Sequence, residues 1–105
     1  MSTNLSKCAK KLILFTRLKK REARKFLQAA NASIINALSE IAYNVREGVV
    51  KVSNRLKNSK LVKVLSQKTT PLKIKYQLLC AAAAPIIAQA LVSAVLAILE
   101  ALRYG

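Results

Sequence analysis

The sequence predicts an all-α protein. The chain of 105 residues holds only two Gly and two Pro, and its apolar content of 53% comes mostly from Ala, Leu, Ile and Val. Gly and Pro are the strongest breakers of regular structure, so their scarcity leaves too few turns for a fold of short strands. Apolar residues recur every three or four positions, which is the helical period. We expect three short basic amphipathic helices followed by one long hydrophobic C-terminal helix, kinked near Pro85.

The first expected helix runs from Ser6 to about Lys25. Most basic residues of this segment fall outside its apolar stripe, which is typical of an amphipathic helix with a basic face. The stripe consists of Cys8, Ala9, Leu12, Phe15 and Leu18. A second apolar pattern begins at Phe26 and stops at Gly48, where a glycine suits a C-terminal cap. The asparagines of this second segment are mediocre helix formers, so its helicity must depend on packing.

A third, shorter helix is expected after the connector 49–52. Ser53 stands where an N-cap belongs, and the apolar positions that follow run from Leu56 to Leu65. The segment also carries Arg55, Lys57, Lys60 and Lys63. We therefore expect a short helix with a mostly cationic surface.

The last helix has the clearest start signal in the chain. Thr70 followed by Pro71 pairs a good N-cap with the imino acid that is favoured at the first helical position. From Leu72 a single helix can continue to about Arg103. Pro85 removes one backbone hydrogen bond within it and should bend the helix there. The chain divides on this reading into a basic helical region, 1–70, and a hydrophobic C-terminal helix, 71–105.

The stretch from Gln77 to Leu99 is uncharged and apolar over 23 residues. At 1.5 Å per residue it would reach about 34 Å, enough to cross a hydrocarbon layer of ~30 Å. Because Ala contributes little to membrane insertion, the alternative is a helix that packs inside protein. A spanning helix would form a tail anchor with the basic region on the interior side of the membrane. The candidate membrane or docking residues are Leu78, Leu79, Ile86, Ile87, Leu91, Val92, Val95, Leu96, Ile98 and Leu99.

Positive charge is concentrated before this stretch. Between Lys7 and Lys75 there are 18 Lys or Arg against three Glu, and the net charge of the chain is +15. A polyanion would relieve the self-repulsion of such a surface. Lysines outnumber arginines, which favours phosphate neutralisation without sequence readout. The candidate residues for binding nucleic acid or another anionic surface are Lys10, Lys11, Arg17, Lys19, Lys20, Arg21, Arg24, Lys25, Arg55, Lys57, Lys60, Lys63, Lys68, Lys73 and Lys75.

The sequence lacks the residues that catalysis needs. It has no His and no Asp, and its four Glu are scattered, so no acid/base pair, triad or metal cluster can be assembled. Cys8 and Cys80 fit neither a disulfide framework nor a zinc pattern. Lys7 and Lys10 favour a lowered pKa for the Cys8 thiol, but a base partner is missing. We expect a non-enzymatic protein without catalytic residues, metal or cofactor.

Two segments resemble a known group of viral proteins. They are Ala37-Leu-Ser-Glu-Ile-Ala-Tyr-Asn-Val-Arg-Glu-Gly-Val, covering 37–49, and Lys68-Thr-Thr-Pro-Leu-Lys-Ile-Lys-Tyr-Gln-Leu-Leu, covering 68–79. With the basic segment between them, they resemble a small basic virion-associated protein of adintoviruses and Maverick/Polinton-type elements, likened to the small core protein of adenoviruses. The match covers roughly 26–80. A Gly-Gly pair typical of the group is replaced here by Cys80 and an Ala run, which favours a helical tail.

The resemblance implies a virion protein of a double-stranded DNA virus, located in the virion and, during assembly, in the host nucleus or cytoplasm. We therefore expect a viral core or minor capsid-associated protein whose basic helices contact DNA phosphates or the inner capsid. Its last helix would dock on capsid protein or enter a membrane. Further candidate partners are membrane lipid and a second copy of the chain. The main alternative is a cationic membrane-active protein that binds anionic lipid and permeabilises or forms pores. A third reading is a free-standing bundle with a solvated basic surface.

Overall fold

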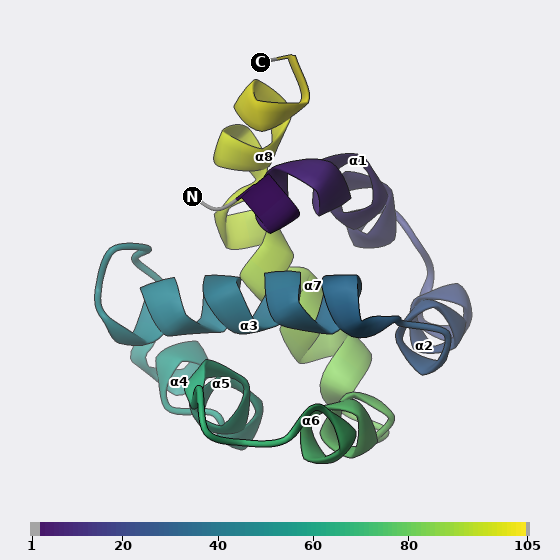
Figure 1. The fold of residues 1–105 in the computed structure, drawn as a ribbon, viewed down its shortest axis with the longest axis vertical. Coiled ribbons are helices and arrows are strands. Elements are labelled where there is room, and N and C mark those ends of the chain that lie inside the picture. The colour runs from purple at the N-terminus through teal and green to yellow at the C-terminus, as the bar shows by residue number, and fades with distance from the viewer. Residues whose placement is uncertain (1–2, 105) are drawn as a thin grey trace.

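The computed structural model describes residues 3–104, and this range contains eight helices and no strand (Figure 1). The helices are α1 (Thr3–Thr16), α2 (Lys20–Gln28), α3 (Ala32–Arg46), α4 (Asn54–Lys57), α5 (Lys60–Ser66), α6 (Leu72–Leu79), α7 (Ala84–Ala94) and α8 (Leu96–Tyr104). The predicted all-α class is confirmed. The expected set of three basic helices and one long hydrophobic helix is wrong, because each expected helix is broken by a turn.

The first expected helix is divided into α1 and α2. The N–H groups of Arg17 and Leu18 donate to carbonyls three residues back, at 3.0 and 3.2 Å, which tightens and ends α1. In an uninterrupted helix, positions 15 and 26 would lie about 16 Å apart along the axis. The bend instead stacks Phe15 on Phe26, with ring centroids 4.7 Å apart. Packing of the two largest apolar side chains in this region therefore favours the break.

The second expected helix begins later than predicted, at the start of α3. Asn31 is its N-cap, since the side-chain oxygen accepts the backbone N–H of Ile34 at 3.0 Å. Phe26 accordingly belongs to α2. At the other end, Gly48 follows α3 with φ +79°, a conformation that favours glycine. The predicted glycine stop is confirmed.

The third expected helix is two short helices. Ser53 caps α4 as predicted, with its hydroxyl accepting the N–H of Leu56 at 3.2 Å. After one turn the chain bends, and Ser59 caps α5 by accepting the N–H of Val62 at 3.3 Å. The second cap lets α5 lie along α3 with Leu61, Val62 and Leu65 buried.

The long C-terminal helix is divided into α6, α7 and α8. The axes of α6 and α7 meet at a bend of 105° across a break of four residues. Pro85 lies in the first turn of α7, where its missing N–H costs no hydrogen bond, so it begins a helix instead of kinking one. Thr70 is not the cap of α6: the N-cap is Pro71, and the Thr70 hydroxyl donates to the Gln67 side chain at 2.9 Å.

The size of the molecule explains this division. A straight helix from 72 to 103 would be about 48 Å long, whereas the molecule measures 32 × 29 × 24 Å along its principal axes. Breaking the segment lets its apolar side chains enter one shared core. Within residues 3–104, no individual helix combines the length and apolar character of a bilayer-crossing segment, and α6 with α7 meets that standard only when the two are joined across their bend.

One hydrophobic core unites the described parts of the two expected regions, 3–70 and 71–104. Figure 1 shows α3 in the middle of the molecule, with α7 crossing it and α8 continuing past α1. The N-terminal helices, α3, α5 and the C-terminal helices all contribute fully buried side chains. The largest are Phe15, Leu5, Leu12, Ile13, Leu27, Leu38, Ile41, Leu65, Leu79, Leu91 and Leu99.

Candidate anion-binding surface

Most of the candidate anion-binding residues lie on the surface. Of the fifteen, twelve are exposed and two, Arg24 and Lys57, are half-buried. Lys75 is the exception, with 6% of its surface exposed. The helices thus present nearly every candidate cation to solvent, while their apolar stripes form the core. A surface of this kind can neutralise phosphates but offers little for base recognition.

Twelve of these fourteen surface cations fall into two groups along the chain, which we call the α1–α2 group and the α4–α5 group. Figure 1 shows α2 near one end of α3 and α4 with α5 near the other. The α1–α2 group is Lys10, Lys11, Arg17, Lys19, Lys20, Arg21, Arg24 and Lys25. The α4–α5 group is Arg55, Lys57, Lys60 and Lys63. Lys68 and Lys73 lie in the α5–α6 loop and on α6. The surface cations therefore lie mainly on two sets of helices, α1 with α2 and α4 with α5, which we call the two basic patches.

The candidate docking residues divide between core and surface. Leu79, Leu91, Val92, Val95 and Leu99 are buried, Leu78, Ile87 and Leu96 are half-buried, and Ile86 and Ile98 are exposed. Half of this set is therefore already packed inside the protein. The most exposed member, Ile86, has 61% of its surface free.

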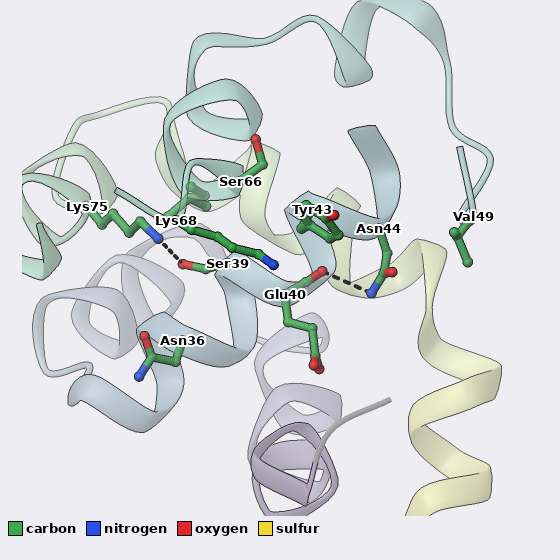
Figure 2. Close-up of a pocket in the computed structure, with 10 residues that line it drawn as sticks. Asn36, Ser39, Glu40, Tyr43, Asn44, Val49, Ser66, Lys68 and Lys75 are labelled. Carbon is green, nitrogen blue, oxygen red and sulfur yellow. Dashed lines mark hydrogen bonds between the residues drawn. The ribbon is translucent and has the colours of Figure 1, made fainter. Parts of the chain in front are cut away.

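A pocket of about 600 Å³ lies between α3, the α5–α6 loop and α6 (Figure 2). Its walls carry two lysines, one carboxylate and several hydroxyl and amide groups. The lining residues are Asn36, Ser39, Glu40, Tyr43, Asn44, Val49, Leu65, Ser66, Lys68 and Lys75. Pockets that bind small molecules are usually of this size. We call this feature the Lys75 pocket.

Lys75 projects from α6 toward α3 with its stem buried. Its ammonium donates a hydrogen bond of 3.2 Å to the Ser39 hydroxyl (Figure 2). The Ser39 hydroxyl in turn donates to the Ile35 carbonyl at 2.8 Å, so that its lone pairs face the lysine. Burial lowers the pKa of Lys75, because removal from water penalises the charged ammonium.

Lys68 contributes the second cation of the Lys75 pocket. Its ammonium lies 4.7 Å from the centre of the Tyr43 ring, a cation–π contact at the surface. Tyr43 is carried by α3 and Lys68 by the α5–α6 loop. The segments 37–49 and 68–79, which carry the resemblance described above, therefore meet at this pocket.

Sequence reasoning did not identify the α3 side of the Lys75 pocket. The signal was present as polar residues that interrupt an apolar pattern: Asn36, Ser39, Glu40, Tyr43 and Asn44 follow helical spacing on one face of α3. From the sequence, Asn36 and Asn44 were interpreted as weak helix formers, and no pocket was expected on this face of α3. Their role in the pocket depends on α6 packing against α3, which spacing along the chain does not reveal.

The Cys8 thiol is buried and donates a hydrogen bond of 3.7 Å to the Ser33 carbonyl. Burial raises its pKa, and nearby Lys11 lowers it by less. The lowered pKa suggested by the neighbouring lysines is therefore wrong, because desolvation outweighs their charge. Within residues 3–104, no three His, Cys, Asp or Glu side chains gather in a way that could hold a metal ion.

Comparison with protein-family models, with curated proteins and with solved structures found no match to this chain.

Proposed function

We propose that this is a non-enzymatic structural protein that binds double-stranded DNA through the phosphate backbone, without sequence preference. The main support for the proposal is that the fold separates the apolar residues, which form the core, from the basic residues, which lie on the surface. The apolar side chains of the C-terminal segment largely serve the core, while fourteen candidate cations remain on the surface. A net charge of +15 makes such a surface favour a polyanion.

The resemblance of segments 37–49 and 68–79 supports a place for this protein in a virion. In that setting the basic patches neutralise packaged DNA, or contact the inner capsid surface, and counter-charges relieve the repulsion among the lysines. The two basic patches lie on different helices, α1 with α2 and α4 with α5, which supports contacts to two neighbouring DNA segments. The exposed apolar residues Ile86 and Ile98 are available for contact with capsid protein.

The test is the affinity of the full chain for a labelled 30-base-pair duplex of random sequence over a salt series. We expect log K to fall linearly with log salt with a slope steeper than about −4, because each neutralised phosphate releases about 0.9 counterion. Duplexes of different sequence should bind within about threefold of one another. A shallow slope, or strong preference for one sequence, would contradict phosphate neutralisation.

Matched variants locate the DNA contact. K19Q/K20Q/R21Q removes three charges from the α1–α2 group, and R55Q/K60Q/K63Q removes three from the α4–α5 group. We expect the first variant to reduce the slope more, by up to about 3, because its patch holds more cations. Equal reductions would instead indicate diffuse attraction by total charge alone.

Vesicles that contain anionic lipid separate this proposal from the membrane-active alternative. An electrostatic surface contact falls steeply with salt, whereas inserted apolar side chains remain bound at high salt. We expect the full chain to leave such vesicles at high salt. Salt-resistant vesicle binding that exceeds DNA binding would favour the membrane-active protein.

A further inference from the structure

The Lys75 pocket holds a buried cation whose known partner is neutral. Among the described residues, the structure gives the Lys75 ammonium one hydrogen bond, to the Ser39 hydroxyl. An ammonium carries three N–H donors, and a buried charge is normally paired with an opposite charge. The side chain of Lys75 is 6% exposed, and burial lowers the pKa of its ammonium, because partial removal from water penalises the charged form.

Ser39 cannot supply that compensation. Its single hydrogen is directed to the Ile35 carbonyl at 2.8 Å, so the hydroxyl orients the ammonium but brings no negative charge. Glu40 also lines the pocket, but Figure 2 shows its carboxylate pointing away from the Lys75 ammonium. The Lys75 side of the pocket is therefore positive.

The same pocket contains a second ammonium and space for a ligand. Lys68 lines it from the α5–α6 loop, held over the Tyr43 ring. Asn36 adds an amide that can donate a hydrogen bond. A volume of about 600 Å³ exceeds what a single ion needs and is suited to a small organic molecule.

We propose that the Lys75 pocket binds the phosphate group of a small phosphorylated ligand, with Lys75 and Lys68 contacting the phosphate oxygens. Lysine acts in such sites as a compact point charge, and two ammonium groups match the dianion of a phosphate monoester. Ser39 is a positioning residue that holds the Lys75 ammonium toward the ligand. This site is distinct from the two exposed patches and does not rest on the proposed DNA binding.

The test is an NMR titration of the full chain at constant ionic strength, with inorganic phosphate in one arm and a nucleoside monophosphate in the other. We expect saturable shifts of the backbone amides of Ser39, Tyr43 and Lys75 in both arms. Tighter binding of the nucleoside monophosphate assigns the rest of the pocket to the organic part of the ligand. Equal binding limits the site to the phosphate group.

Two matched variants on α6 provide the control. K75M removes the buried ammonium, whereas K73M removes an exposed one two residues away. We expect K75M to weaken the pocket response at least about tenfold, which corresponds to losing a charged contact, and K73M to leave it within about twofold. Lys68 is exposed, so K68Q should not disturb the core. We expect K68Q also to weaken phosphate binding in the pocket.

The proposal is overturned if the pocket amides do not shift, or if K75M and K73M weaken phosphate binding equally. Either result would show phosphate gathering around the basic surface only. DNA affinity provides an independent readout, because K75M should change it no more than K73M does. If K19Q/K20Q/R21Q and R55Q/K60Q/K63Q lose DNA binding but keep the phosphate-induced shifts of the pocket amides, phosphate binding in the pocket is independent of the DNA-binding surface, as proposed.

Discussion

The Lys75 side chain is buried, and its ammonium donates its one hydrogen bond among the described residues to a neutral hydroxyl, that of Ser39. K75M keeps the length of the buried stem and removes the ammonium, which no longer has to be desolvated. We expect the free energy of unfolding to rise by about 1 kcal/mol, as when buried charges are replaced by apolar groups of similar size. K73M, on the exposed side of α6, should change it little. Urea unfolding measures both, and a marked destabilisation by K75M would show that the lysine is fully compensated in the fold.

The lowered pKa of Lys75 also gives stability a pH dependence of definite sign. In the unfolded chain the lysine titrates near its ordinary value of 10.5, and in the folded chain it loses its proton at a lower pH. Between these two values the unfolded state binds more protons, so this residue makes stability increase as pH rises. The stability difference between K75M and the unaltered chain should therefore shrink toward pH 10.5. Unfolding curves at several alkaline pH values test this, and a difference that widens would contradict the sign.

At the scale of elements, one side chain links the end of α1 to α7. Gln89 donates from Nε2 to the carbonyls of Phe15 and Leu18, at 2.9 and 2.8 Å. The Leu18 carbonyl thereby gains a side-chain donor, and the Phe15 carbonyl gains a second donor beside the Leu18 N–H. Gln89 is half-buried and stands within an otherwise apolar run. Its two hydrogen bonds connect the end of α1 to α7.

Replacing this glutamine should loosen the α1–α7 contact. We expect Q89A to lower the free energy of unfolding by about 2 kcal/mol, because two hydrogen bonds are lost: the Leu18 carbonyl loses its side-chain donor, and the Phe15 carbonyl keeps only the Leu18 N–H. Q77A is the matched control, since Gln77 is exposed on α6. Thermal unfolding of both variants gives the comparison, and equal stability would mean that water replaces the amide at no cost.

Helix caps and stops that depend on neighbouring residues could be predicted from the sequence, whereas the packing of the helices against one another could not. The Ser53 cap and the Gly48 stop depend only on neighbouring residues, and both were predicted. Asn31 and Ser59 are cap residues of the same kind, but the apolar period continues across them and suggested longer helices. The run 81–84 is all Ala, the best helix former, yet the chain turns between α6 and α7. The turn lets α7 cross α3 and bury its apolar side chains in the core. Exposure of the cations followed from amphipathic spacing, whereas burial of Lys75 required the position of α6.

At the scale of the whole molecule, the two regions of the chain depend on each other. A chain ending at Thr70 would lose Leu79, Leu91 and Leu99, which fill the centre of the core. Each such side chain contributes several kcal/mol when buried, and a domain is stable by only about 5–15 kcal/mol in total. We expect this truncated chain to lose cooperative unfolding and most of its helical circular dichroism. A truncated chain that unfolds cooperatively would show that 1–70 is a separate domain.

We propose that the apolar C-terminal segment is part of the core and that the basic surface is the part of the protein that binds its partner. The most direct measurement is amide hydrogen exchange of the full chain in buffer without lipid or DNA. We predict that α7 exchanges as slowly as α3, because both open only when the whole domain unfolds. Fast exchange throughout α7 and α8 beside a protected α3 would contradict the claim, since it would show an apolar tail free of the core and available to a membrane.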